Sequence, residues 1–356
     1  MAVAPSLDQH VPERALPWDT GRDAAVDLVR GTAIVCMVIA HLTIMAPAAS
    51  GPTAIAVGLA NNVASPLFAV VMGVSAGIVL TRRHRPVKGG AFVLRNVARG
   101  LLLIAIGVAL EQLRSYVAIV LMSLGATLVI AAPLSLLPVP VVAATAVGTF
   151  VAGPWVNAAA RGALPPTRVA SDAWVDQVLQ WLVLSPHYRV VSLLPFVLLG
   201  VVLARAGLTR GVALLTLLMG VLAGVVVVAL QLAGHGVGGP AHVSGSVPDA
   251  LLDLTLAAGA FGVLVLLARW RPAAPLVAAL APVRGVGALS LTAYVLHVGL
   301  IALVLATIEW PRMQQSWVPL CVAIMLVTVL GCWAWWRLLG RGPLERAMAL
   351  VTDRIG

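Results

Sequence analysis

Charged residues are scarce in this sequence. Aspartate, glutamate, lysine and arginine make up only 10% of its 356 residues, whereas hydrophobic residues make up 61%. A water-soluble globule of this length needs far more polar surface than such a composition provides. Together with a mean hydropathy of +1.02, the composition excludes soluble classes and predicts a protein surrounded by membrane lipids.

Lysine is almost absent, since Lys88 is the single lysine among 23 basic residues. The formal net charge of +10 does not indicate a nucleic-acid partner. The arginines gather in short loops between apolar segments, as membrane topology requires, rather than on one face. A preference for arginine with abundant alanine, valine and glycine is typical of a GC-rich bacterial genome. We therefore expect a multi-pass protein of the bacterial cytoplasmic membrane.

Soluble catalytic motifs and metal-binding patterns are also missing. The sequence contains no Walker loop, no GxSxG, no HExxH and no strand-terminal GxGxxG. His235 and His242 lie in a glycine-rich loop with no carboxylate before Asp249, and their spacing matches no familiar ligand pattern. Cys321 and Cys332 lie about 16 Å apart on one predicted helix and cannot pair. We expect no metal cofactor.

The apolar segments predict an all-α polytopic bundle of about ten transmembrane helices, because each span needs about 20 apolar residues. The expected spans are 28–47, 54–80, 92–112, 116–132, 139–156, 187–205, 211–232, 249–268, 286–308 and 317–338. Residues 1–22 are expected to form a loose cytoplasmic tail, 23–348 a single transmembrane domain and 349–356 a C-terminal tail. The pattern around Trp174 and Trp181 predicts a short interfacial helix between two spans.

The basic residues predict the orientation of the bundle. With the N-terminus in the cytoplasm, 18 basic residues fall inside and 5 outside. The positive-inside rule therefore favours an even number of spans with both termini cytoplasmic. The linker from Pro133 to Pro140 carries no charge and does not constrain this assignment.

Ionisable groups in the first span are candidates for function, because charged groups in spans are costly. Arg30 and His41 are separated by about 20° around the helix and about 16 Å along it, so they share one face with Ile34 and Met37. This stripe would suit a long, thin ligand that enters from the cytoplasm. His41 has the chemistry of a general base, or it packs by hydrogen bonding to another helix. Arg30 is a ligand-binding residue or a topological anchor paired with Asp27.

Three further groups of polar residues are candidates. Glu111, at the outer end of the third span, either orients a histidine or pairs with Arg114. Tyr294 and His297 share one stripe of the ninth span, which suits either a passage or interhelical hydrogen bonds. Basic residues crowd one cytoplasmic loop and the following helix, where they would bind a phosphorylated ligand or anionic lipid headgroups. They are Arg82, Arg83, Arg85, Lys88, Arg95 and Arg99.

Four segments resemble a known superfamily. The run VDLVRG at 26–31, followed by ten residues and His41, is similar to the arginine-x10-histidine motif of membrane acyltransferases. That superfamily includes the acyltransferase-3 proteins and a heparan-glucosaminide N-acetyltransferase-like branch. SPLFAVVMGVSAGIVL at 65–80 resembles the second span of that branch. GALSLTAYVLH at 287–297 and GRGPLERAM at 340–348 resemble late segments of related proteins.

The resemblance implies an acyltransferase that takes an acyl group from acyl-CoA, as co-substrate, to a hydroxyl or amine of an envelope glycan or lipid. It implies a catalytic role for His41, with Glu111 as a possible partner. The donor would be held by Arg30, Arg82, Arg83, Arg95 and Arg99, and Tyr294 and His297 would line the passage. The animal-type enzymes carry their essential histidine in the loop after the first span. Residues 47–65 contain no histidine, so a glucosamine acceptor is not implied.

Two other function classes fit the same composition. A transporter or flippase would move an anionic or lipid-linked solute without covalent chemistry, and its polar groups within the spans would be substrate ligands. A signalling or assembly component of the envelope would keep the fold without the activity. Turnover of acyl-CoA by the purified protein separates the acyltransferase from both.

Overall fold

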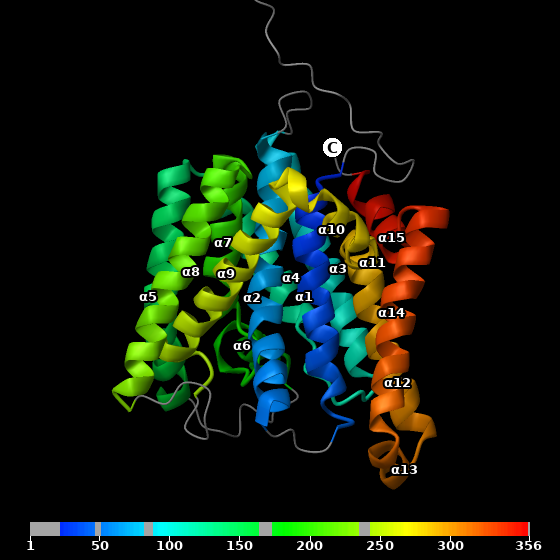
Figure 1. Cartoon of the computed structure of the whole chain (residues 1–356). Helices are drawn as coiled ribbons and strands as arrows, with labels where there is room; N and C mark the ends of the chain where they lie inside the picture. The colour runs from blue at the N-terminus through cyan, green and yellow to red at the C-terminus, as the bar shows by residue number, and fades with distance from the viewer. Residues whose placement is uncertain (1–21, 47–50, 82–87, 164–172, 235–242, 355–356) are drawn as a thin grey trace, which may run out of the picture.

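The protein is an all-helical bundle in the part that the computed structural model describes, which is residues 22–46, 51–81, 88–163, 173–234 and 243–354 (Figure 1). No strand occurs in these ranges. The predicted fold class is therefore confirmed. Eight helices of the described residues are long and apolar enough to cross a bilayer. They are α1 (Ala24–Leu42), α2 (Gly51–Thr81), α3 (Gly89–Glu111), α5 (Val139–Ala163), α8 (Arg210–Leu232), α9 (Val247–Arg269), α12 (Ser290–Thr307) and α14 (Trp317–Leu339).

The other two predicted spans coincide with shorter apolar helices. α4 (Leu121–Leu134) has 14 residues and α7 (Val190–Ala206) has 17, below the about 20 that a full crossing needs. Most residues of both helices are buried against the rest of the bundle. A helix enclosed by protein can be shorter than the bilayer is thick. Neighbouring protein groups can hydrogen-bond the backbone N–H and C=O groups beyond its ends. The expected count of about ten therefore corresponds to eight long helices and two short ones.

Short helices connect or cap the long ones. They are α6 (Trp174–Leu179), the π-helix η2 (Gln180–Leu184), the 3-10 helix η3 (Arg271–Ala273), α10 (Ala274–Ala279), α11 (Ala281–Ala288), α13 (Trp310–Gln315) and α15 (Pro343–Thr352). The short helix predicted around Trp174 and Trp181 is present as α6 and η2. The predicted span 286–308 is divided at Leu289, between α11 and α12. α15 continues past the domain boundary expected at residue 348.

Both described ends of the chain lie at the same end of the bundle. Figure 1 shows the start of α1, in dark blue, and α15, in red, at the top of the molecule. We call this the terminal end, and the other the opposite end. The side of the membrane that each end faces stays a prediction from the arginine distribution.

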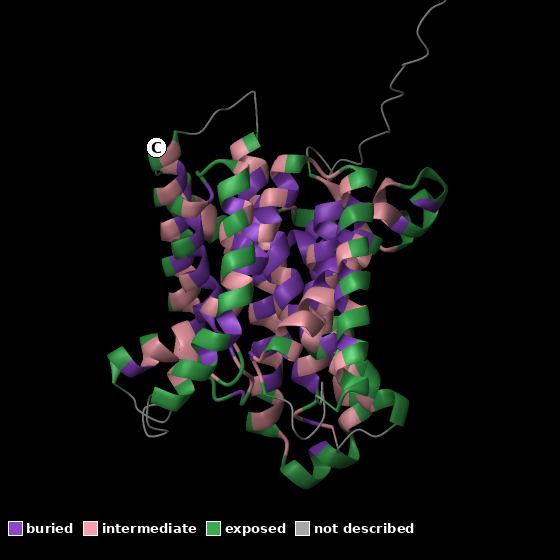
Figure 2. Ribbon diagram, turned by 90° about the vertical axis from the view of Figure 1, so that its left-hand side faces the viewer, coloured by how far each residue is buried: buried purple, intermediate pink, exposed green. Residues whose placement is uncertain are grey.

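The outer faces of the helices are apolar. Figure 2 shows buried residues gathered between the helices and exposed residues on the outward faces. On α8 the exposed residues are mostly leucine and valine, including Leu214, Leu215, Leu218, Val221, Leu222 and Val225. A contiguous apolar face of this extent on a soluble protein would associate with another surface. Here it matches the hydrocarbon of a bilayer, so the protein is an integral membrane protein.

Close helix packing holds the site-bearing helices in place. A Cβ atom added at Gly287 of α11 would lie 1.9 Å from the carbonyl oxygen of Asp27 on α1. One added at Gly31 of α1 would lie 2.0 Å from the carbonyl oxygen of Val283. Only glycine permits this approach, as in other small-residue helix interfaces within membranes. α11, which precedes the Tyr294 and His297 helix, is thereby fixed against the helix that carries Arg30 and His41.

Candidate active site

Two histidines from distant parts of the sequence form a pair inside the bundle. Nδ1 of His41 on α1 lies 2.9 Å from Nε2 of His297 on α12. The imidazole rings are stacked, with centroids 5.1 Å apart and an interplanar angle of 24°. His41 is 8% exposed and His297 is fully buried. We call His41 and His297 the histidine pair.

The hydrogen bonds of the histidine pair determine which nitrogen atoms carry protons. Nδ1 of His297 lies 2.9 Å from the carbonyl oxygen of Ala293, which can only accept. Nδ1 of His297 therefore carries a proton, and in the neutral ring Nε2 accepts one from Nδ1 of His41. Nε2 of His41 is then left unprotonated, and it has no hydrogen-bond partner within the described residues. General-base or nucleophilic catalysis by histidine requires an unprotonated imidazole nitrogen of this kind.

Tyr294 lies between the histidine pair and a cavity. Its ring meets the His297 ring edge-on at 5.2 Å and the His41 ring at 6.2 Å, measured between centroids. Its hydroxyl oxygen accepts a hydrogen bond of 3.2 Å from the backbone N–H of Val120. The same residue lines a cavity of about 730 Å³ that opens toward the terminal end. Tyr294 is therefore the residue at which this cavity approaches the histidine pair.

We call this space the arginine cavity, because its charged lining is mostly basic. Five arginines and two carboxylates line it: Arg22, Arg30, Arg95, Arg99, Arg341, Glu345 and Asp353. Ile34 and Met37 of the first-span stripe line its deeper part. Met37 precedes His41 by one helical turn, about 6 Å along the axis. His41 itself does not line the cavity.

Arg30 is held by neutral and charged partners together. Its guanidinium donates to the hydroxyl of Ser75 at 2.5 Å and to the carbonyl oxygen of Gly287 at 3.3 Å. The carboxylate of Asp27 lies 3.5 Å away and bonds Arg22 more closely, at 2.6 Å. The predicted Asp27 pairing is therefore present, and Arg30 also faces the cavity.

α15 closes one side of the arginine cavity and supports α12. The Glu345 carboxylate accepts hydrogen bonds from the backbone N–H groups of Leu291 and Thr292, at 2.9 and 3.0 Å, and from the Thr292 hydroxyl at 2.5 Å. A carboxylate at a helix N-terminus satisfies otherwise unpaired N–H groups and interacts favourably with the helix dipole. Glu345, in the tail motif at 340–348, thus positions the helix that carries Tyr294 and His297.

The remaining predicted site residues have different placements. Arg82 and Arg83 lie outside the described residues, as do His235 and His242. Glu111 is exposed at the end of α3, and the described residues contain no hydrogen bond between it and His41. The side chain that lies within hydrogen-bonding distance of His41 is His297. Within the described part of the chain, no three potential metal-binding side chains cluster together.

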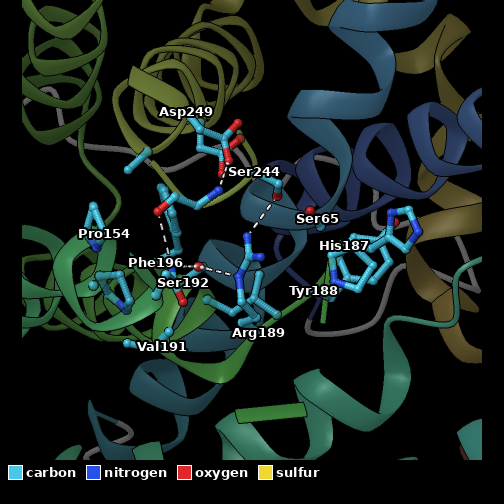
Figure 3. Close-up of a pocket in the computed structure, with 18 of the residues that line it drawn as sticks. Ser65, Pro154, His187, Tyr188, Arg189, Val191, Ser192, Phe196, Ser244 and Asp249 are labelled. Atoms are coloured by element: carbon cyan, nitrogen blue, oxygen red, sulfur yellow. Dashed lines mark hydrogen bonds between the residues drawn. The ribbon is translucent and has the colours of Figure 1, made fainter. Parts of the chain in front are cut away.

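A second cavity, of about 670 Å³, lies at the opposite end (Figure 3). Two carboxylates and two guanidinium groups line it: Asp249, Asp253, Arg161 and Arg189. We call it the mixed-charge cavity. Arg189 donates to the Ser244 hydroxyl at 2.8 Å and to the Ser192 hydroxyl at 3.4 Å (Figure 3). It also donates to the Ser185 carbonyl oxygen at 2.7 Å.

His187 and Tyr188, in the segment before α7, also line the mixed-charge cavity. Burial raises the pKa of the Tyr188 phenol to about 12. Burial, and then the charge of Arg189, lowers the pKa of His187. The Ser123 hydroxyl donates a hydrogen bond of 3.0 Å to the Tyr188 carbonyl oxygen, and Val120, three residues earlier, donates to the Tyr294 hydroxyl. The start of α4 therefore contacts both Tyr188, which lines the mixed-charge cavity, and Tyr294, which lines the arginine cavity.

Several of these residues were not identified from the sequence. Ser75 and Glu345 act through contacts between helices far apart in the chain, which no local pattern reveals. Asp253 carried a usable signal, because an acidic residue one turn after Asp249 within an apolar span is costly unless it serves a function. The Pro186–Arg189 segment precedes α7, and its place in a cavity depends on how α7 packs in the bundle.

Together, these features define a multi-pass membrane protein with a buried histidine pair beside the arginine cavity and a second cavity at the opposite end. The sequence profile described as heparan-alpha-glucosaminide N-acetyltransferase, catalytic, matches residues 22–229, more than half of the chain. The chain belongs to this family. A second profile, described as protein of unknown function (DUF418), matches residues 201–354. No curated protein matches the chain. The protein is a transmembrane acyltransferase-like protein, as its resemblance to that superfamily predicted.

Proposed function

We propose that this protein is a membrane acyltransferase that moves an acyl group from a cytoplasmic acyl-CoA-type donor to a hydroxyl or amine of an envelope glycan or lipid. One observation carries the proposal. Nε2 of His41 is buried, unprotonated in the neutral pair and unpartnered among the described residues, one helical turn from the arginine cavity. The family match supports the same reaction class. The protein would act in the bacterial cytoplasmic membrane, with its terminal end in the cytoplasm.

The arginine cavity suits the donor. Its lining carries an excess of positive charge, and guanidinium groups bind phosphate oxygens through paired, charge-assisted hydrogen bonds. Arg95 and Arg99 of α3 would bind the nucleotide phosphates, with Arg30 deeper in the cavity. The thin pantetheine arm would follow the apolar wall past Ile34 and Met37. Its thioester would then approach Tyr294 and the histidine pair.

The proposed chemistry requires one proton acceptor. The hydroxyl or amine of the acceptor attacks the thioester carbonyl carbon while Nε2 of His41 takes its proton. The new C–O or C–N bond forms, the C–S bond breaks, and the proton passes from His41 to the departing thiolate. The products are the acylated acceptor and free CoA thiol. His297 would hold His41 in the required tautomer and share the transient positive charge.

The same nitrogen also suits an acyl-carrier route. His41 would then attack the thioester directly, release the thiol and hold the acyl group until the acceptor takes it. The two routes differ in the order of thiol release and acceptor binding. The carrier route releases thiol before any acceptor binds, so rapid quenching with donor alone would yield acylated His41, detected by mass spectrometry of the peptide. The base route yields no such peptide.

Release of free thiol tests the proposed function. The purified full-length protein in lipid nanodiscs, given acetyl-CoA and an envelope lipid and glycan extract, should release thiol in proportion to an acetyl-sized mass gain on one extract component. Extract alone, acetyl-CoA alone and the His41→Gln variant serve as controls. Absence of both thiol release and mass gain with acetyl-CoA and with longer acyl-CoA donors would reject the proposal.

A transporter or flippase is the second candidate, favoured by the presence of cavities at both ends of the bundle. Such an arrangement also suits alternating access, in which a solute passes between two sites without covalent change. Proteoliposomes distinguish the two functions. A transporter would move a labelled anionic or lipid-linked solute across the bilayer without acyl-CoA and without change in solute mass.

A further inference from the structure

The Tyr294 hydroxyl has an unused hydrogen-bond donor in the wall of the arginine cavity. Tyr294 is 2% exposed, and its hydroxyl oxygen accepts from the backbone N–H of Val120 at 3.2 Å. Both residues line the cavity. A phenol hydroxyl accepts and donates, so the Val120 contact leaves its own proton available. Within the part of the chain that the structure describes, this proton is donated to no acceptor.

Other hydroxyl groups in the cavity lining are already engaged as donors. Ser75 donates to the Val71 carbonyl oxygen at 2.7 Å and also accepts from Arg30. Thr352 donates to the Met348 carbonyl oxygen at 3.1 Å. A buried polar hydrogen without an acceptor is costly, and an oxygen atom of a bound ligand is an acceptor that removes this cost. Tyr294 is therefore equipped to contact a ligand oxygen.

The start of α4 adds partial positive charge at the same place. Val120 is the N-cap residue of α4, and Leu121, the first residue of the helix, also lines the cavity. The N–H groups of a first helical turn have no partner within the helix, and the helix dipole is positive there. The Val120 N–H holds the Tyr294 hydroxyl against this helix end. A preorganised hydroxyl donor beside a helix N-terminus favours a developing negative charge.

The histidine pair lies beside this group. The centroid of the Tyr294 ring is 5.2 Å from that of His297 and 6.2 Å from that of His41. In the proposed reaction Nε2 of His41 takes the proton of the acceptor, so the thioester carbon has to lie close to His41 as well. A thioester that enters through the arginine cavity reaches His41 past Tyr294. Its carbonyl oxygen then comes within reach of the Tyr294 hydroxyl.

We infer that Tyr294 is a catalytic residue whose hydroxyl stabilises the oxyanion formed from the thioester carbonyl, together with the first turn of α4. The inference rests on the proposed function, because the oxyanion belongs to that reaction. As the acceptor attacks the carbonyl carbon, the C=O electron pair moves onto oxygen, and Tyr294 donates a hydrogen bond while it keeps its proton. The electron pair returns as the C–S bond breaks. The acyl-carrier route passes through the same kind of oxyanion.

Steady-state kinetics test this role. Tyr294→Phe removes the hydroxyl and keeps the ring. In full-length protein in nanodiscs, supplied with acetyl-CoA and the envelope extract, kcat should fall about 10²- to 10³-fold, as it does when one oxyanion donor is lost. The donor KM should stay near the parent value, because the arginines would hold the phosphates. Tyr116→Phe is the matched control, since Tyr116 is 80% exposed and lines neither cavity.

Infrared spectra of the bound donor give a readout that needs no turnover. His41→Gln is expected to bind acetyl-CoA without transferring its acetyl group. With an isotope label on the thioester carbonyl carbon, the labelled band should lie at lower wavenumber than in free acetyl-CoA, because a hydrogen bond weakens the C=O bond. Adding Tyr294→Phe to His41→Gln should return the band toward the free position. Adding Tyr116→Phe should leave it in place.

A tyrosine fluorinated beside its hydroxyl covers the case in which Tyr294→Phe does not fold. Incorporated at position 294, it keeps the ring, the hydroxyl and the acceptor for the Val120 N–H. Its fluorine withdraws electron density and makes the hydroxyl a stronger hydrogen-bond donor. The bound carbonyl band should therefore move further to lower wavenumber. A tyrosine that only packs against α4 would leave the band unchanged.

An unchanged kcat in Tyr294→Phe would overturn the inference, and so would a carbonyl band that is the same with and without the hydroxyl. A raised donor KM at unchanged kcat would also overturn it, because Tyr294 would then serve binding alone. Normal acyl transfer by Tyr294→Phe would reject this inference and leave the proposed function intact. Absence of transfer by the parent protein would reject the proposed function, and the carbonyl band would still show whether Tyr294 contacts the thioester oxygen.

Discussion

Nδ1 of His41 and Nε2 of His297 lie 2.9 Å apart, although 256 positions separate the two residues in the sequence. Nδ1 of His297 donates to the Ala293 carbonyl oxygen, so in the neutral pair Nδ1 of His41 donates to Nε2 of His297. Nε2 of His41 is then left unprotonated and free to accept a proton. In the proposed reaction His41 would therefore be the catalytic residue, and His297 would be a positioning residue.

Replacement of His297 tests this relationship. His297→Leu should lower the acyl-transfer rate by about 10- to 100-fold, as loss of an orienting partner commonly does. His297→Gln should retain part of the rate, because its amide oxygen can still accept from Nδ1 of His41. The donor KM should stay unchanged in both. Leu303→Ala, on the exposed face of the same helix, is the control.

A pH profile separates positioning from mere packing. If His297 fixes the tautomer of His41, the pH dependence of the rate should shift in His297→Leu but not in Leu303→Ala. Wild-type rates and profiles in both His297 variants would show that the 2.9 Å contact has no catalytic role.

The arginine cavity predicts a defect in donor binding. Arg99→Gln should raise the donor KM by about 5- to 150-fold, which corresponds to about 1 to 3 kcal/mol for a charge-assisted hydrogen bond. Arg210→Gln is the control, because Arg210 binds the Arg269 carbonyl oxygen and lines neither cavity. An unchanged donor KM in both Arg99→Gln and Arg95→Gln would show that these arginines serve membrane topology or lipid binding and do not bind the donor.

The contact between α1 and α11 predicts that alanine substitutions at two glycines differ in their effect on thermal stability. Gly287→Ala should lower the thermal unfolding temperature in detergent, because the new methyl group would meet the Asp27 carbonyl oxygen, and overpacking costs about 1 to 3 kcal/mol. Gly299→Ala, whose Cβ would have nothing within 4 Å, should be neutral or slightly stabilising. Equal unfolding temperatures for the two variants would contradict the close approach.

Reporter fusions test the orientation. The distribution of 18 basic residues inside and 5 outside predicts a cytoplasmic reporter after Gly356 and near Pro86, and an exterior one near Gly238. An exterior C-terminal reporter would show that the predicted orientation or the number of spans is wrong. The segment from Pro133 to Pro140 is where an error in the number of spans would most directly arise.

The sequence predicted the fold class, the position of most spans and the face shared by Arg30, Ile34 and Met37. These follow from hydropathy and helical periodicity, which are local properties. The lengths of α4 and α7 were not predictable in the same way. Apolar composition does not show that a helix lies inside the bundle, where it can end short of the membrane surface.

The candidate site was predictable in its residue types but not in its pairings. His41 and His297 were both candidates, yet their contact depends on α1 and α12 meeting. Glu111 was considered as a partner of His41, whereas the structure has His297 beside it, because depth along a span does not specify which helix is adjacent. The mixed-charge cavity was missed since its lining comes from α2, α5, α7 and α9 together.

The most direct measurement is the acyl-transfer rate of His41→Gln with a defined donor thioester and acceptor. Gln can keep a packing hydrogen bond but cannot take up and return a proton near neutral pH. Loss of a general base costs about 10² to 10⁴ in rate. We therefore expect a loss of at least that size, with expression and thermal stability near wild type and donor binding retained. A His41→Gln variant that keeps most of the wild-type rate would show that His41 is structural and that the proposed mechanism is wrong.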